Sequence, residues 1–222
     1  RGNVDVGKLY QILAYAADVK TVSDYEAALT QATKEDGTRY NIRSSNLYFL
    51  EGIKTTTFEI IEQMRWSAPD WLVIPMGSGG HLSMAQRGLQ QLVEVGLIGD
   101  TDTRFLGVQA KGCSPIVEAW KKNSAISPAS SVSTIAIDIG VRNPPCGELA
   151  LEALRKSEGM ALAVSDEEIL DAVRTLAKTE GVFAEPASAT TIAALKQLVD
   201  SGEIDASDTV VCIVTSTGLK YP

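Results

Sequence analysis

The stretch Trp71-Leu-Val-Ile-Pro-Met-Gly77-Ser78-Gly79-Gly80-His81-Leu82-Ser83 determines the fold class. Its bulky residues at 71–74 predict a buried strand, which Pro75 ends. Three glycines follow, and they allow positive φ angles and close approach of the backbone to a ligand. A helix is then predicted from Leu82 to Val95. A buried strand leading through a glycine-rich loop into a helix predicts an α/β protein.

The glycine-rich loop is predicted to bind an anion, most simply a phosphate group. Free N–H groups at the start of a helix attract negative charge, and Ser78 would add a hydroxyl donor. The loop is not a Walker loop, because no Lys-Ser/Thr pair follows it. Nor is it GxGxxG, because Leu82 stands where the third glycine belongs. Two alternatives stay open: the glycines form a purely structural turn, and His81 caps or packs the helix.

Helical and strand patterns alternate on both sides of this stretch. Strands are predicted at 104–109, 160–164 and 209–214, with helices at 50–64, 115–120, 148–157 and from Pro186. Ser165 and Glu168 form a capping box that opens a helix reaching about Glu180. Strands separated by helices predict a parallel sheet covered on both faces.

The first quarter of the chain has a different pattern. Helices are predicted at 5–17 and at 24–32, the second with Asp24 as its N-cap. Short strands are predicted at 18–22 and 39–42, the latter just after Gly37. The polar stretch 43–46 separates this region from the rest.

Composition excludes several classes of function. The 222 residues carry a net charge of −8, which argues against a nucleic-acid partner. Three cysteines without a CxxC motif and a single His81 exclude a cysteine zinc site, a histidine metal cluster and a Ser-His-Asp triad. No metal is therefore expected. No apolar run reaches the ~18 residues of a membrane span, and a cytoplasmic protein is expected.

The end of the last predicted strand is rich in hydroxyl groups. It delivers Thr215-Ser216-Thr217-Gly218-Leu219-Lys220 to the carboxyl edge of the sheet, where open α/β sheets bind ligands. The Thr215 hydroxyl can hydrogen-bond a heteroaromatic nitrogen, or the segment is an ordinary Ser/Thr-rich turn. Because this loop and Gly77–Gly80 both follow strands, the two can share one rim of the sheet.

Together these motifs resemble those of threonine synthases, pyridoxal-phosphate enzymes of the tryptophan-synthase-β fold. The resemblance extends along essentially the whole chain and is carried by 46–55, 58–60, 75–80, 108–117, 180–189 and 215–220. It implies an open parallel three-layer α/β sheet of fold type II, incomplete here. Residues 1–45 would be the remnant of a small mobile domain and 46–222 most of the large one. A homodimer is expected.

The resemblance also implies roles for individual residues toward pyridoxal 5′-phosphate. Thr215 would face the pyridine nitrogen, and a phosphate cup would be formed by Gly77, Ser78, Gly79, Gly80 and His81. Asn46 and Lys54 would contact the substrate, or Lys54 would simply cover a helix. Glu185 lies near the ring in one interpretation and is a surface helix cap in the other.

The lysine that forms the Schiff base in this family would lie upstream of Arg1. It belongs to a Ser-Phe-Lys-Asp type motif, and no lysine of this chain has such a context. Since that lysine is the nucleophile of the covalent catalysis, no catalytic residue is assigned. The chain alone is expected to be inactive.

The resemblance implies conversion of O-phosphohomoserine, a small phosphorylated amino acid, and water into threonine and phosphate. Two departures keep other functions open: Phe49 stands where the family often has arginine, and Gly77–His81 differs from the usual Gly-Asn-x-Gly-Asn. The alternatives are a paralogue of the cysteate synthase or threonine dehydratase type, and a non-catalytic phosphate-binding module. A Rossmann nucleotide site is disfavoured, because the strand after Gly80 ends at Gln109 rather than at an acidic residue.

Overall fold

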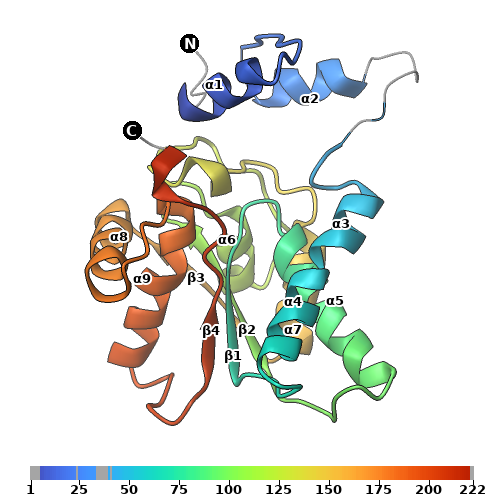
Figure 1. Cartoon of the computed structure of the whole chain (residues 1–222), viewed down its shortest axis with the longest axis vertical. Coiled ribbons are helices and arrows are strands. Elements are labelled where there is room, and N and C mark those ends of the chain that lie inside the picture. The colour runs from blue at the N-terminus through green and yellow to red at the C-terminus, as the bar shows by residue number, and fades with distance from the viewer. Residues whose placement is uncertain (1–5, 24, 34–39, 41, 221–222) are drawn as a thin grey trace.

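The computed structural model describes residues 6–23, 25–33, 40 and 42–220. At its centre lies a parallel sheet of order β3-β2-β1-β4 (Figure 1), formed by Trp71–Pro75 (β1), Arg104–Ala110 (β2), Met160–Val164 (β3) and Val210–Cys212 (β4). In β1, Leu72 pairs with Phe105 of β2 on one side and with Val211 of β4 on the other. Every residue of β1 is buried, as expected for a parallel strand that is covered on both faces.

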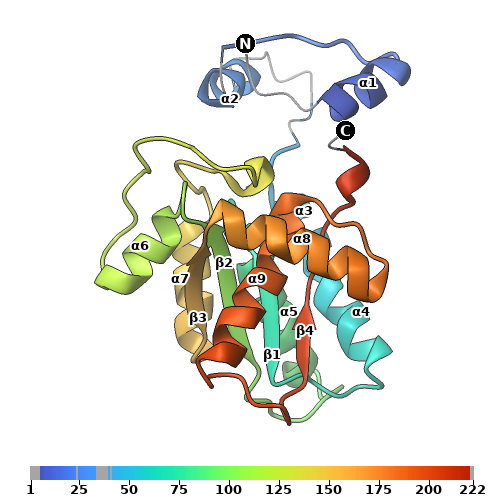
Figure 2. The same cartoon turned by 90° about the vertical axis from the view of Figure 1, so that its left-hand side faces the viewer.

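Helices cover both faces of this sheet (Figures 1 and 2). One face packs on α9 (Pro186–Asp200), against which lies α8 (Asp166–Glu180). The other face is covered by α4 (Thr55–Gln63), α5 (Gly80–Glu94), α6 (Pro115–Lys122) and α7 (Gly147–Lys156), with α3 (Leu47–Ile53) packed on α5. Alternate residues of β1 serve the two cores: Trp71 and Val73 face the α9 side, whereas Leu72 and Ile74 face the other. The predicted three-layer architecture is confirmed.

The predicted capping box at the start of α8 is present. Ser165 Oγ accepts the N–H of Glu168 at 3.3 Å, and the Glu168 carboxylate accepts the N–H of Ser165 at 2.6 Å. Burial acts to raise the pKa of Glu168, but hydrogen bonds from Ser165, Lys111 and Gln197 outweigh it and lower that pKa to about 2. The same carboxylate therefore caps α8 and ties it to α9 and to the loop after β2.

Two sequence predictions differ from the structure in the lengths of elements. The helix predicted at 50–64 is two helices, α3 and α4, joined at Lys54. The hydroxyls of Thr55 and Thr56 bond the carbonyls of Gly52 and Ile53, taking acceptors at the end of α3. The strand predicted at 209–214 is shortened to Val210–Cys212, because the chain beyond it turns toward the start of α9.

The N-terminal region is helical without strands in its described part. Val6–Ala14 forms α1 and Tyr25–Thr33 forms α2. The strand predicted at 18–22 is wrong: these residues are irregular, since β-branched residues alone make no strand without a partner to pair with. Asp24, Gly37 and two of the four residues of the strand predicted at 39–42, 39 and 41, lie outside the described residues, and the other two, 40 and 42, are not in a strand.

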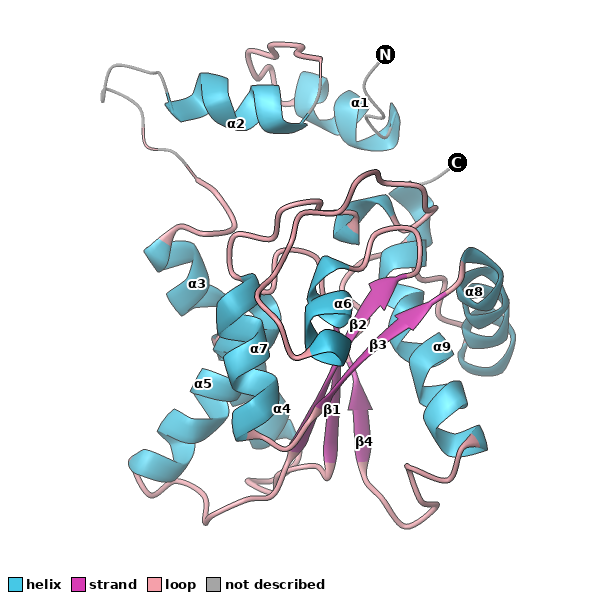
Figure 3. Ribbon diagram, turned by 180° about the vertical axis from the view of Figure 1, so that it is seen from behind, coloured by secondary structure: helices cyan, strands magenta, loops and turns pink. Residues whose placement is uncertain are grey.

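Both N-terminal helices lie beyond the end of the sheet toward which the strands point (Figure 3). There α1 contacts the short helix η2 (Gly218–Lys220). The ammonium group of Lys8 also donates to the carboxylate of Asp138 at 2.6 Å, in the short helix η1 (Ile137–Ile139). The N-terminal helices thus cover the carboxyl ends of the strands. Within the described ranges, no helix combines the length and apolarity needed to cross a membrane.

Candidate active site

The glycine-rich loop and the hydroxyl-rich loop leave neighbouring strands at the same edge of the sheet. Val73 of β1 pairs with Cys212 of β4, and the N–H of Ile213 donates to the carbonyl of Val73 at 3.0 Å. Adjacent strands lie ~4.8 Å apart. The expectation that the two loops share one rim is therefore confirmed.

The glycine-rich loop ends in a helix start that no side chain of the described residues caps. Gly79 is the N-cap of α5, with φ of 86°, and α5 begins at Gly80. The first N–H groups of a helix have no partner within it. That of Gly80 reaches a side chain only at long range, Ser78 Oγ at 3.3 Å. The carbonyl of Ser78 accepts the N–H of Cys146 at 2.9 Å, which fixes the loop from behind.

Close packing explains why this loop requires glycine. A Cβ on Gly79 would lie 2.6 Å from the carbonyl oxygen of Cys146, and one on Gly80 would lie 2.9 Å from Leu50 Cδ2. The positive φ of Gly79 would strain any other residue as well. Close packing and backbone conformation therefore explain why glycines are needed here. Neither reason involves their backbone N–H groups, which remain available as hydrogen-bond donors.

His81 lies in the first turn of α5 and makes no cap hydrogen bond. Its Nε2 atom is buried and has no hydrogen-bond partner among the described residues. Burial lowers the pKa of His81 to about 4, so the imidazole is neutral at pH 7. A buried ring nitrogen without a partner suits a ligand that can donate to it or accept from it.

Thr215 presents its side chain to solvent at the opposite loop. Its hydroxyl lies 2.8 Å from Ser188 Oγ of α9, which also accepts the N–H of Ser216 at 2.9 Å. The N–H of Glu185 donates to the carbonyl of Ser216 at 3.1 Å. The start of α9 thus positions the hydroxyl-rich loop.

Glu185 is buried beneath that loop, with 3% of its surface exposed. Although it occupies the N-cap position of α9, it makes no cap hydrogen bond. Its Oε1 lies 3.4 Å from Ser188 Oγ, and its Oε2 lies 4.0 Å from Nζ of Lys220. Of the two interpretations of Glu185, the surface cap is excluded.

The two predicted substrate residues lie at opposite ends of α3. Asn46 Oδ1 is the N-cap of α3, accepting the N–H groups of Tyr48 and Phe49 at 3.0 and 3.3 Å. Lys54 pairs with Glu51, and a Cβ on Gly88 would lie 3.0 Å from the Lys54 carbonyl oxygen. Gly88 follows Gly80 by two turns of α5, or about 12 Å. The structure does not bring Lys54 to the glycine-rich loop.

Sequence reasoning missed three residues that shape the site. Ser188 bridges Glu185 and Thr215, Cys146 buttresses the glycine-rich loop, and Asp138 lies near Glu185. Of these three, only Ser188 could have been found from the sequence. It stands three residues after Glu185 at the start of a predicted helix, where the two side chains share a face.

The rim offers complementary groups to the two ends of a phosphorylated pyridine: an uncapped helix start for the phosphate and a neutral hydroxyl for the ring nitrogen. Fold and site together define the class of fold type II pyridoxal-phosphate enzymes. Residues 1–216 match the sequence profile of the family described as pyridoxal-phosphate dependent enzyme. The chain belongs to this family, whose cofactor is pyridoxal 5′-phosphate.

Individual relatives agree with this assignment. The threonine synthase of Methanocaldococcus jannaschii is 41% identical over 225 residues, which cover 100% of this chain and 55% of that protein. The chain thus spans just over half the length of this relative. Among solved structures, a fungal L-serine ammonia-lyase from Rhizomucor miehei (TM-score 0.80, 20% identity, 98% of this chain and 68% of that one) shares the fold. So does the processed form of threonine deaminase isoform 2 from Solanum lycopersicum (TM-score 0.75, 19% identity, 95% and 59%).

Proposed function

We propose that this chain belongs to a threonine synthase-like lyase that converts O-phosphohomoserine and water into threonine and phosphate. The observation that carries the proposal is the pairing of an uncapped helix start at Gly79 with the Thr215 hydroxyl in the loop after the adjacent strand β4. The identity of 41% to a threonine synthase over the whole chain supports the choice of reaction.

In this proposal the phosphate of the cofactor is held by main-chain amides of Gly77–His81 and by the Ser78 hydroxyl. Thr215 hydrogen-bonds the ring nitrogen. A neutral hydroxyl cannot balance a full positive charge there as a carboxylate would. When bound, pyridoxal phosphate withdraws electrons from the bonds around Cα of an amino acid. A hydroxyl from Thr215 at the ring nitrogen, in place of a carboxylate, moderates that withdrawal of electrons.

Residues 1–45 are, in this proposal, part of a small domain that closes over the rim, and 46–222 are most of the large domain. The position of α1 above the strands and its link from Lys8 to Asp138 support this role. Closure excludes water from the reacting atoms and orients the substrate. The full protein is proposed to be a homodimer, which light scattering would test.

A dehydratase-type activity is the second candidate. It is favoured by Phe49, which stands where an arginine for the substrate phosphate was expected, and by its partial exposure at the start of α3. The likeness to an ammonia-lyase and a deaminase supports the fold alone. The two candidates differ in their products: threonine and phosphate from one, a keto acid and ammonia from the other.

The full-length protein would be incubated with pyridoxal phosphate and O-phosphohomoserine. Equal amounts of threonine and phosphate are expected. Keto acid and ammonia from threonine or serine would support the dehydratase instead. Loss of all turnover despite cofactor binding would favour a non-catalytic module. The 222-residue chain alone is expected to bind pyridoxal phosphate weakly and to turn nothing over.

A further inference from the structure

Glu185 is a buried carboxyl group with poor compensation for a negative charge. Its Oε2 atom has no hydrogen-bond partner among the described residues, and the nearest ammonium, that of Lys220, lies 4.0 Å away. Its Oε1 lies 3.4 Å from Ser188 Oγ, a long hydrogen bond. An ionised carboxylate in such surroundings is costly, which favours the protonated form.

Charged groups from three other elements face Glu185. Asp138 of η1 repels its negative charge, whereas Lys220 of η2 and Lys8 of α1 attract it, and the Ser216 hydroxyl favours the charged form. Burial is the largest influence on Glu185, and together with Asp138 it raises the pKa of the carboxyl group above its ordinary value. The geometry and the charges therefore agree on a proton at this position.

Ser188 connects this proton to Thr215. Its hydroxyl has a single proton to donate, and it already accepts the N–H of Ser216. If Glu185 carries a proton, Glu185 donates to Ser188, Ser188 donates to Thr215, and the Thr215 proton points away from the chain. If Glu185 is ionised, Ser188 donates to Glu185, Thr215 donates to Ser188, and Thr215 offers only lone pairs outward.

We propose that Glu185 is a positioning residue whose proton sets the direction of the Glu185–Ser188–Thr215 hydrogen bonds. With Glu185 neutral, Thr215 donates to an unprotonated pyridine nitrogen. With Glu185 ionised, Thr215 donates to Ser188 instead, and an unprotonated nitrogen loses its hydrogen-bond donor. This inference rests on the proposed function, because it needs the ring nitrogen at Thr215.

The first test uses the cofactor-free protein. Infrared difference spectra between the protein and Glu185→Gln, recorded across pH, report whether the Glu185 carboxyl is neutral. A protonated carboxyl signal that persists well above the ordinary titration range of glutamate is expected. Titration of Glu185 at its ordinary value would overturn the inference, whether or not the cofactor binds.

The second test adds pyridoxal phosphate labelled with ¹⁵N in the ring. The nitrogen signal of the unmodified protein should shift as Glu185 ionises with rising pH, because the unprotonated ring nitrogen loses the hydrogen bond from Thr215. In Glu185→Gln it should stay at the position of the hydrogen-bonded nitrogen, because the amide N–H donates to Ser188 at every pH. Glu203→Gln, a change at the exposed far end of the sheet, is the matched control and should behave like the unmodified protein.

The outcomes separate the two proposals. Binding with the same nitrogen signal in both proteins at every pH would overturn the role of Glu185 alone. Failure of the protein to bind pyridoxal phosphate would overturn the proposed function, and this inference with it. In Ser188→Ala the signal should no longer respond to the ionisation of Glu185, even where the carboxyl still titrates.

Discussion

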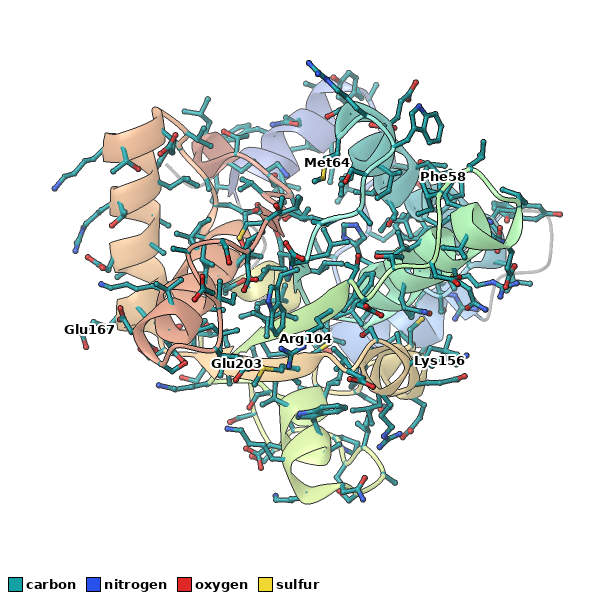
Figure 4. All side chains as sticks on the ribbon, turned by 90° about the horizontal axis from the view of Figure 1, so that it is seen from below. Phe58, Met64, Arg104, Lys156, Glu167 and Glu203 are labelled. Carbon is teal, nitrogen blue, oxygen red and sulfur yellow. The ribbon has the colours of Figure 1, made fainter. Side chains whose placement is uncertain are left out.

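The two ends of the sheet differ in how completely their polar groups are satisfied. At the amino end, the guanidinium of Arg104 stacks 4.1 Å from the centre of the Trp71 ring, bonds Glu203 at 3.0 Å and donates to the carbonyl of Glu158 at 3.1 Å (Figure 4). At the carboxyl end lie His81, Gln109 and Glu185. These contribute the buried side-chain atoms that lack a hydrogen-bond partner within the described structure.

This contrast shows where the chain keeps its binding capacity. Satisfied groups stabilise a fold, whereas a buried polar atom without a partner is destabilising unless something binds it. Changes at the carboxyl end should therefore alter ligand binding and its pH dependence. Changes at the amino end should alter only stability.

Gly79→Asp should have the largest effect on binding. Two unit charges 4 Å apart repel by about 4 kcal/mol at an effective dielectric constant of 20, which corresponds to roughly a thousandfold loss of affinity for a phosphate. Calorimetric titration with inorganic phosphate or pyridoxal phosphate measures it. Gly96→Asp is the matched control, since Gly96 also has a positive φ but follows the far end of α5.

Because Gly79 is tightly packed, its replacement can also perturb folding. Ser78→Asp places a carboxylate in the same loop while Gly79 is retained, and it should weaken phosphate binding in the same direction. Unchanged affinity in a folded Ser78→Asp protein would mean that the anion binds elsewhere.

His81 should make stability depend on pH. Its pKa is lowered in the folded protein to about 4 from the ordinary value of 6.5. The free energy of unfolding that depends on a neutral His81 is therefore fully present above pH 6.5 and is lost as the pH falls through about 4. The loss is on the order of 3 kcal/mol. Urea unfolding at several pH values should show this loss and should not show it in His81→Asn. Glu168, with its lowered pKa, acts only at more acid pH.

Ser165→Ala should cost about 1 kcal/mol of unfolding free energy, because it removes the cap of α8. Ser165 lies at the carboxyl end too, but its hydrogen bonds are satisfied. Phosphate affinity should therefore not change, and Ser165→Thr should retain most of the stability. Weaker phosphate binding in folded Ser165→Ala would contradict the distinction between satisfied and unsatisfied groups.

Arg104→Ala should have only a small effect, and on stability alone. An exposed cation–π contact and a surface ion pair each contribute about 0.5–1 kcal/mol or less. Thermal unfolding should show a small decrease in stability, and phosphate affinity should stay the same. Arg87→Ala, whose weak ion pair with Glu94 spans 3.9 Å, should change even less.

The sequence predicted those parts of the molecule that depend on local chemistry. Apolar runs and turn residues located β1, β2 and β3 to within a residue, and the Ser165–Glu168 spacing located the start of α8. The helix break at Lys54 was missed, because Thr55 fits a helix and its hydroxyl bond to Gly52 is invisible in a periodicity pattern.

The sequence predicted only those parts of the candidate site whose signal lies within a single loop. The glycine-rich loop is evident from its composition, Thr215 from its place at the end of a predicted strand, and the likeness to a known family joined the two in one site. The contact between Ser188 and Thr215 joins residues 27 positions apart and depends on how α9 packs under β4. The burial of Glu185 and the buttress at Cys146 likewise arise from packing, which no local pattern encodes.

The left-handed backbone at Gly79 has a consequence for how this gene can change over time. Every amino acid except proline has a backbone N–H, so a phosphate site built from main-chain donors does not depend on particular side chains around it. Substitution is restrained at Gly79 and its tightly packed neighbours, whereas the main-chain donors themselves require no particular side chain. This tolerance is consistent with a shared fold at only 20% identity with the fungal L-serine ammonia-lyase.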